Sequence, residues 1–331
     1  MEQRKLGRPG TVPQREVSVI GLGTWQLGAD WGEVDEGQAM AVLDAAVSAG
    51  VTFFDTADVY GNGRSEQVIG AYLAKNPSAA VTVATKMGRR APLDPAEYTM
   101  GNFRAWTDRS RRNLRVDTLD LVQLHCPPEA VFHDDAVFDA LDELVADGRI
   151  RAYGVSVETC DQALSAIARP ALTSVQIILN AFRRKPLEAV LPVADTAGVA
   201  IIARVPLASG LLSGRYDEHT QFAATDHRSY NRHGEAFDVG ETFAGVPYEV
   251  GVAAAREVAA LTPDGATTAQ LALRWIVDQP GVSVVIPGAR TPEQARNNAR
   301  AAALPPLDDA TLAALERIYD ERIREHVHTR W

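Results

Sequence analysis

Short apolar runs alternate along most of the chain with segments whose apolar residues recur at helical spacing. A short apolar run bounded by turn residues is typical of a buried strand, whereas a period of 3.6 residues is typical of a helix. The pattern predicts strands at residues 19–25, 51–55, 81–86, 119–125, 150–157, 173–179, 199–205 and 282–286. It predicts helices at residues 35–50, 65–75, 102–115, 135–147, 159–168, 187–197, 248–261 and 267–278, then after Thr291 and near 309–323.

Eight strands that alternate with helices indicate an α/β fold of the (β/α)8 type, the TIM barrel. Residues 3–19 alternate polar and apolar positions around Arg8-Pro9-Gly10, which predicts an N-terminal β-hairpin. The glycine-rich segment 206–246 forms a long loop after strand seven, and active-site lids are often built from such loops. No low-complexity linker divides the chain, so we expect one domain over residues 1–331.

The competing fold is an open, doubly wound sheet, which usually carries a Gly-x-Gly-x-x-Gly turn. Here Gly21 and Gly23 are followed by Gln26, so this fingerprint is only half present. We interpret the two glycines instead as positions where another backbone segment comes close to the first strand.

Charge and cysteine content argue against several classes of function. The 331 residues carry a formal net charge of −10, which disfavours binding to nucleic acid. No run has the length of a signal-peptide core or a membrane helix, and two cysteines cannot form a disulfide framework. We therefore expect a cytoplasmic protein that does not enter the membrane. His219, His227 and His233 lack the spacing of metal ligands, so we expect no metal.

Four ionisable residues mark the ends of predicted strands. Asp55, Lys86 and His125 each end an apolar run, and Tyr60 follows Asp55 by five residues. Because the C-terminal ends of barrel strands meet at one face, these side chains can gather in one place. Taken singly, each has an ordinary alternative, such as a solvated rim residue or a turn tyrosine. Together they form a candidate catalytic site.

An acid, an ammonium, a phenol and an imidazole can together donate a proton to a carbonyl. We expect the ammonium of Lys86, held by Asp55, to lower the pKa of the Tyr60 phenol from its usual value of about 10. His125 can donate a hydrogen bond to the same oxygen, which makes the carbonyl carbon ready to accept a hydride. No side chain supplies a hydride, so the chemistry requires a cofactor.

The start of the last barrel helix predicts where an anionic part of that cofactor binds. Thr291 is a good N-cap, Pro292 suits the first turn, and Gln294 can complete a capping box. Free amides at a helix N-terminus beside Arg290 favour an anion, although a plain, well-capped helix is the alternative. The loop 210–214 can cradle a second phosphate.

These motifs resemble those of the aldo-keto reductase superfamily, in the style of its bacterial and Kv-channel β-subunit-like branches. The likeness follows residues 21–25, 55–61, 85–86, 124–125, 154–156, 176, 206–212 and 286–288 in order. The resemblance implies a barrel that binds NADP(H) and acts on a small-molecule carbonyl. It implies Tyr60 as general acid, Asp55 and Lys86 as the groups that tune it, and His125 as the residue that orients the carbonyl.

The resemblance also implies the contacts of the cofactor and substrate. Ser156 and Gln176 would hold the nicotinamide carboxamide, residues 206–214 the pyrophosphate, and residues 288–298 the adenosine 2′-phosphate. The implied cofactor-binding set is Gly23, Thr24, Trp25, Asp55, Ser156, Gln176, Arg204, Pro206, Leu207, Ser209, Gly210, Leu211, Gly214, Ile286, Gly288, Ala289, Arg290, Gln294, Asn297 and Asn298. The implied substrate pocket contains Trp25, Trp31, Tyr60 and His125.

Three positions depart from the usual pattern of that superfamily. Val157 stands where Asn often follows the strand-five serine, and Arg204 stands where an aromatic ring commonly stacks on the nicotinamide. Gly288 stands where some relatives have a Lys for the 2′-phosphate. A planar guanidinium can also stack on a ring, and Arg290 is the substitute cation for the phosphate.

The function indicated is the NADPH-dependent reduction of an aldehyde or ketone to an alcohol. Two alternatives stay open: a redox-sensing subunit that binds NADP with little turnover, and an NAD-dependent sugar dehydrogenase. The sequence identifies neither the substrate nor the oligomeric state.

Overall fold

Eight parallel strands form the centre of the computed structural model, which describes residues 1–7, 15–28 and 34–331. The strands, in sheet order, are β10 (Val282–Val285), β9 (Ala200–Arg204), β8 (Ser174–Ile178), β7 (Tyr153–Ser156), β6 (Leu121–His125), β5 (Thr82–Met87), β4 (Phe53–Asp55) and β3 (Leu22–Gly23). Bridges from Ile20 to Val285 and from Gly23 to Gly288 bring the first strand beside the last. The sheet is thus a nearly closed barrel, as predicted, and the open doubly wound alternative is wrong.

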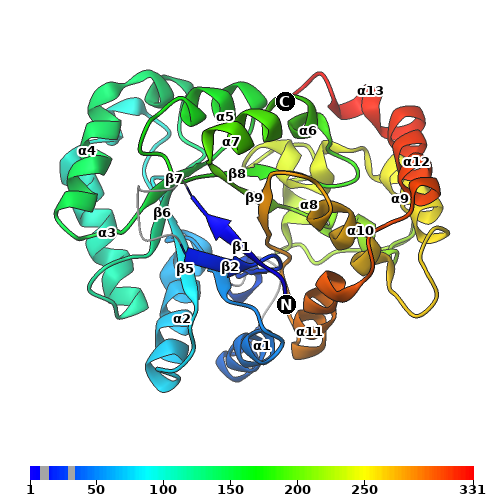
Figure 1. Ribbon diagram of the computed structural model, residues 1–331, viewed down its shortest axis with the longest axis horizontal. Coiled ribbons are helices and arrows are strands. Elements are labelled where there is room, and N and C mark those ends of the chain that lie inside the picture. Colours follow the sequence, from blue (N-terminus) through cyan, green and yellow to red (C-terminus); the bar gives the residue numbers. More distant parts are fainter. Residues whose placement is uncertain (8–14, 29–33) are drawn as a thin grey trace.

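Helices surround the barrel between successive strands (Figure 1). They are α1 (Glu36–Ser48), α2 (Arg64–Lys75), α3 (Met100–Leu114), α4 (Asp135–Ala146), α5 (Cys160–Ile167), α6 (Lys185–Ala189), α7 (Leu191–Ala197), α8 (His227–Tyr230), α9 (Tyr248–Ala259), α10 (Thr268–Val277), α11 (Pro292–Arg300), α12 (Asp309–Ile318) and α13 (Arg324–Val327). Within the described ranges, no helix has both the length and the apolar character needed to cross a bilayer.

Two of the differences in bounds have a clear physical cause. The helix expected over 187–197 is divided into α6 and α7, with Pro192 in the first turn of α7. Proline has no amide hydrogen and clashes with the preceding turn, so it begins a helix more readily than it continues one. The first strand ends at Gly23 rather than at Trp25, because Trp25 begins a 3₁₀ turn, Trp25–Gly28.

The glycines of the first strand allow the close contact that the sequence predicts. A Cβ atom on Gly23 would lie 2.9 Å from the carbonyl oxygen of Ile286, and one on Gly21 would lie 3.0 Å from the Phe53 ring. Any larger residue would push the first strand away from its neighbours. The two glycines therefore help to close the barrel.

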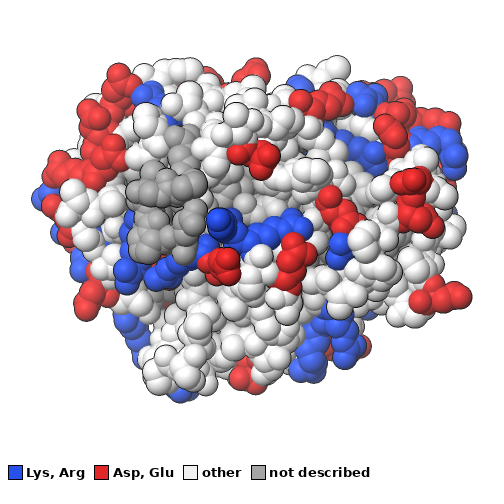
Figure 2. Space-filling model, in the orientation of Figure 1, with Lys and Arg blue, Asp and Glu red and all other residues white. Residues whose placement is uncertain are grey.

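The N-terminal hairpin lies across one end of the barrel (Figure 1). It consists of β1 (Gln3–Leu6) and β2 (Arg15–Ser18), and its predicted turn lies outside the described residues. Leu6 and Val17 pack against the inward-facing side chains of the strands, which are Phe53, Ala84, Leu121, Ala152, Ala200, Ile202, Val284 and Ile286. Arg15 fixes the hairpin from outside through Asp120, at 2.7 Å. Basic and acidic side chains are interspersed over the described part of this face (Figure 2).

Candidate active site

The four predicted catalytic side chains lie together at the C-terminal ends of β4, β5 and β6. Lys86 Nζ lies 2.6 Å from Asp55 Oδ2, 2.9 Å from the Thr56 carbonyl oxygen and 3.2 Å from the Tyr60 hydroxyl. The ring of His125 meets the ring of Tyr60 edge-on, with centroids 5.9 Å apart. Parallel strands in a closed barrel end at the same rim, which explains how residues distant in sequence meet here.

A tight turn after β4 carries Tyr60. Tyr60–Gly63 is a 3₁₀ turn in which Gly61 and Asn62 have positive φ values, 55° and 56°. It packs directly against the turn Trp25–Gly28: a Cβ atom on Gly61 would lie 2.0 Å from the Gly28 carbonyl oxygen. The Trp25 ring stacks on the Tyr60 ring with centroids 5.9 Å apart. Backbone contact between the two turns therefore sets the position of the phenol.

Burial and pairing set the protonation of this group. Burial is the largest influence on Tyr60 and raises the pKa of its phenol, which the ammonium of Lys86 only partly offsets. The expected net lowering of this pKa is therefore wrong for the protein alone, because removal from water outweighs the attraction of one cation. For Lys86, burial lowers the pKa, but Asp55 and Tyr60 outweigh it, so the net shift is upward. The site holds an ammonium beside a protonated phenol.

Asp55 is fixed on both of its carboxylate oxygens. Oδ2 accepts from Lys86, and Oδ1 accepts from Gln176 Nε2 at 2.7 Å and from Gln123 Nε2 at 3.3 Å. All of these groups are buried. A buried ion pair stabilises the fold only where its remaining lone pairs are also satisfied, and the two amides do this here. Asp55 can thus hold Lys86 in one place.

His125 is buried and uncharged. Burial is the largest cause that holds the pKa of its imidazole well below the usual value, followed by the positive charges of Arg89, Lys86 and Arg204. Its Nε2 lies 3.3 Å from a guanidinium nitrogen of Arg89. Its Nδ1 is buried and has no hydrogen-bond partner among the described residues.

A cavity of about 600 Å³ opens over these strand ends. Tyr60, His125 and Trp25 line it, whereas Lys86 lies behind Tyr60 and Trp31 lies outside the described residues. The predicted cofactor-binding residues in its wall are Gly23, Thr24, Trp25, Asp55, Ser156, Gln176, Arg204, Pro206, Leu207, Ser209, Gly210, Ile286, Gly288, Ala289, Arg290, Gln294, Asn297 and Asn298.

Leu211 and Gly214 are the predicted cofactor residues outside this wall. Leu211 points into the core, where its side chain would lie 2.6 Å from a Cβ atom on Gly251. Gly214 has φ 69° and packs against Thr268. The segment Ala208–Ser213 winds as a 3₁₀ turn, so Gly210 and Ser213 face the cavity while Leu211 and Leu212 face the core, which a linear motif does not reveal.

The far end of the cavity reaches two helix N-termini, those of α10 and α11. Thr291 caps α11 by accepting from the Gln294 amide at 3.2 Å. The Gln294 side chain does not return to Thr291 as a capping box requires; it accepts from the Arg290 amide at 2.8 Å. Gln294 thereby orients Arg290 at the cavity wall. Within the described ranges no carboxylate pairs with Arg290, so its charge is available to an anion.

A second group of charges lies beside the catalytic residues. Arg204, at the end of β9, donates to Glu158 at 2.8 Å and to the Val157 carbonyl oxygen at 3.0 Å. Glu241, from the long segment 206–246, lies 2.8 Å from Arg89 and 3.9 Å from Arg204. Burial is the largest influence on both carboxyl groups; it raises the pKa of Glu158, whereas Arg89 and Arg204 overcome it for Glu241 and lower that pKa.

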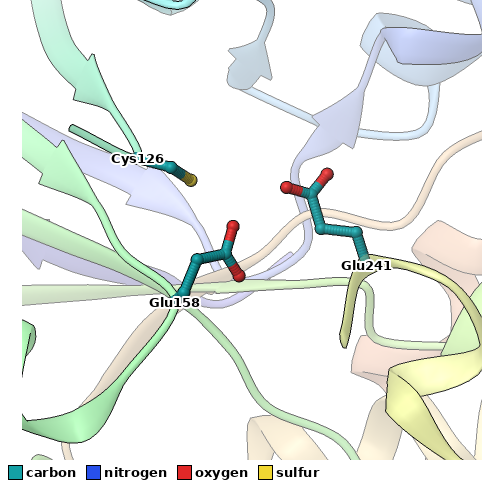
Figure 3. Close-up of side chains that lie close together, drawn as sticks. All are labelled: Cys126, Glu158 and Glu241. Atoms are coloured by element: carbon teal, nitrogen blue, oxygen red, sulfur yellow. The ribbon is translucent and has the colours of Figure 1, made fainter. Parts of the chain in front are cut away.

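The thiol of Cys126 approaches both carboxylates (Figure 3). The three ligating atoms lie within 4.8 Å of one another. Such a group can bind a cation, but both carboxylates are already paired with arginines, so we interpret the cluster as an ion-pair network. Burial, the largest cause, raises the pKa of Cys126, which therefore stays a thiol.

Several residues of this site were not predicted from the sequence. Arg89, Glu158 and Glu241 are ordinary charged residues in irregular segments, and their pairing joins positions far apart in sequence. Gln26 fills the space above Gly288: a Cβ atom there would lie 2.1 Å from its Nε2. This contact explains how the chain accommodates a glycine at 288. In the sequence, only the doublet Arg89-Arg90 just after β5 pointed to this group of charges. Two adjacent arginines are common on protein surfaces, so the doublet alone does not predict a site.

Comparison with known proteins agrees with this geometry. Residues 19–320 match the model of the Aldo/keto reductase family. The aldo-keto reductase YhdN of Bacillus subtilis is 30% identical over 283 residues, which cover 84% of this chain and 83% of that protein.

Two solved structures are also similar. A glycerol dehydrogenase of Gluconobacter oxydans superposes with a TM-score of 0.77 at 30% identity, covering 98% of this chain and 96% of the other. An aldo-keto reductase of Klebsiella pneumoniae, solved in complex with NADPH, superposes with a TM-score of 0.71 at 25% identity and covers 96% of each chain.

Proposed function

The chain belongs to the aldo/keto reductase family, and we propose that it reduces an aldehyde or ketone with NADPH, with Tyr60 as the proton donor. The observation that carries the proposal is the Tyr60 hydroxyl, in a cavity wall, 3.2 Å from an ammonium that Asp55 holds. Solved relatives that bind NADPH support the cofactor.

The residues of the cavity fit NADP(H). Gln176 Nε2 donates to Asp55, so the amide oxygen of Gln176 remains available. That oxygen and the Ser156 hydroxyl would hold the nicotinamide carboxamide. The guanidinium of Arg204 is a flat surface for the nicotinamide ring. Ser209 and Gly210 would meet the pyrophosphate, and Arg290 with Asn298 the 2′-phosphate. When bound, the cofactor supplies the hydride.

The protein's own residues then handle the proton. A carbonyl oxygen bound at the Tyr60 hydroxyl, on the side facing His125, gains negative charge as its carbon is reduced. The Tyr60 proton moves to that oxygen, and the ammonium of Lys86 stabilises the phenolate left behind. Asp55 keeps Lys86 charged and in place throughout. Trp25 stacks on Tyr60 and keeps water from one face of the phenol.

Single-turnover kinetics test this proposal. The enzyme is loaded with NADPH and mixed with a panel of small aldehydes and ketones while cofactor absorbance is followed. Rapid loss of NADPH absorbance with at least one carbonyl is expected. A trace that stays flat for the whole panel, with tight NADPH binding, would instead support a redox-sensing binding subunit.

The reverse direction is the second candidate function, because one similar structure is that of a glycerol dehydrogenase. The same instrument measures it with NADP or NAD and a panel of polyols and sugars. Faster oxidation with NAD than with NADP would favour the sugar dehydrogenase alternative over the proposed reductase.

A further inference from the structure

Arg204 places a positive charge in the cavity wall beside the expected nicotinamide site. Ser156, Gln176 and Ile202 are register partners on β7, β8 and β9, and Ile202 faces the barrel interior. Arg204 is two residues farther along β9, so its side chain points to the same face, one layer nearer the rim. Ser156, Gln176 and Arg204 all line the cavity, which puts the guanidinium next to the groups that would hold the carboxamide.

The carboxylates around Arg204 offset only part of its charge. Glu158 lies 2.8 Å from Arg204, outside the described cavity wall. Burial, the largest influence on Glu158, raises the pKa of its carboxyl to about 7, so near neutral pH it carries only part of a negative charge. Glu241 does line the cavity, but its carboxylate lies closer to Arg89, at 2.8 Å, than to Arg204, at 3.9 Å. An excess of positive charge therefore remains at Arg204.

The other charged groups at this end of the cavity balance one another. Lys86 pairs with Asp55 at 2.6 Å, and His125 is uncharged because burial, above all, holds its pKa well below the usual value. Arg183 and Asp238, which influence Glu158 from outside the described cavity wall, have opposite charges. Arg204 thus sets the sign of the charge that a ring bound here meets.

The two forms of the cofactor differ in the charge of that ring. The nicotinamide of NADP carries a positive charge, whereas the reduced ring of NADPH is neutral, and the phosphates are the same in both. A fixed cation in a wall that excludes water repels the oxidised ring and leaves the energy of the reduced ring nearly unchanged. The guanidinium plane can stack on either form.

Resting on the proposed function, we infer that Arg204 makes the site select the reduced cofactor, because its guanidinium weakens the binding of NADP relative to NADPH. Oxidised cofactor formed by the reaction then leaves readily and competes poorly with NADPH for the cavity. The same charge opposes the positive charge that the ring gains as hydride leaves, so the selection slows the chemical step to some extent. No atom of Arg204 is transferred.

Dissociation constants of the two cofactor forms test this selection without turnover. Calorimetric titration at pH 7 gives the ratio of the NADP constant to the NADPH constant for the wild type and for each variant. Arg204→Gln should lower this ratio by about tenfold, as expected for the loss of one partly offset charge near the ring. Arg204→Lys keeps the charge but not the plane, so both constants should rise while the ratio stays near that of the wild type.

Glu158→Gln tests the same charge with the opposite sign. The amide can still accept a hydrogen bond from Arg204, but the partial negative charge is gone, so the ratio should rise by about threefold. Arg290→Ala is the matched control, since it removes a positive charge from the far end of the cavity. The phosphate that Arg290 is expected to bind is present in both forms, so both constants should rise together and the ratio should not change.

Two results would overturn the selection by Arg204. They are an Arg204→Gln protein whose ratio equals that of the wild type, or a Glu158→Gln protein whose ratio fails to rise. Circular dichroism checks the fold of each variant, and Glu158→Gln decides the question alone if the Arg204 variants do not fold. A wild type that binds both cofactor forms but reduces no carbonyl is a different failure, because it removes the proposed function and leaves the measured ratios standing.

Discussion

The two ends of the barrel are built from the same strands but have opposite character. At the hairpin end, Leu6 and Val17 close an interior that is apolar. At the other end Asp55, Lys86, His125 and Arg204 lie at or next to the last residue of their strands, and all four are buried and charged or polar. Apolar burial stabilises a fold without direction, whereas buried ionic groups cost desolvation and are retained where chemistry needs them. The hairpin end therefore contributes apolar burial, whereas the cavity end holds the candidate chemistry.

The removal of the Tyr60 hydroxyl should have the largest effect, confined to the cavity end. Tyr60→Phe keeps the ring that stacks on Trp25 but has no proton to donate, so carbonyl reduction should fall by about 10²–10⁴-fold. Steady-state kinetics measures the loss, and fluorescence titration should give an unchanged NADPH dissociation constant. Retention of most activity would mean that another group supplies the proton.

Truncation of an apolar side chain at the hairpin end should affect stability alone. Leu6→Ala removes part of the apolar cluster that closes this end of the barrel, so the free energy of unfolding should fall by about 2–5 kcal/mol. Urea unfolding measures this, with the exposed neighbour Lys5→Ala as control. The kcat, measured well below the unfolding transition, should be unchanged; a parallel loss of kcat would show that the two ends are coupled.

Asp58 allows the cost of a buried charge at the cavity end to be measured. Burial, with a smaller effect of Glu66, raises the pKa of its carboxyl to about 7, and its Oδ1 has no partner among the described residues. Because the folded pKa lies above the unfolded one, ionisation destabilises the fold increasingly as pH rises from about 4 to 7. Asp58→Asn should therefore stabilise the protein by about 4 kcal/mol at pH 8 and by little at pH 4.

Thermal unfolding of Asp58→Asn at both pH values measures this difference. The exposed Asp139→Asn on α4 is the control and should change neither transition. A gain of the same size at pH 4 and pH 8 would mean that the charge of Asp58 is not its cause.

The smallest effect is expected at the outer edge of the cavity. Arg290→Ala should weaken NADPH binding by about tenfold, the value of one charge-assisted hydrogen bond, and leave NADH binding nearly unchanged. Titration with both cofactors measures the two constants, and Arg296→Ala, an exposed arginine of α11, is the control. Equal losses for NADPH and NADH would assign Arg290 to another part of the cofactor.

The fold could be predicted because its signals are local. Each strand is an apolar run that ends at a turn residue, and Thr159 and Gln162 form the capping box that begins α5 as expected. The predicted ends of elements were wrong where tertiary contacts determine them. Trp25 lies outside the first strand because the turn that it begins packs against the Tyr60 turn.

The candidate site could be predicted only where a residue stands at a strand end. Asp55, Lys86 and His125 satisfy this condition, and the structure brings them together with Tyr60. Arg89 and Glu241 could not be found in this way, since their ion pair joins two segments that lie outside the strands and far apart in the chain. The direction in which the pKa of Tyr60 shifts could not be predicted from the sequence either, because it depends on how deeply the phenol is buried in the fold.

The contact between Gly28 and Gly61 has a consequence for redesign of this enzyme. Since neither position has space for even a methyl group, the phenol is placed by main-chain packing and not by the residues that vary around it. A directed-evolution library can therefore diversify the wall formed by residues 215–246 and keep these two glycines. Selected variants should acquire new substrate ranges while their proton donor stays at its original coordinates.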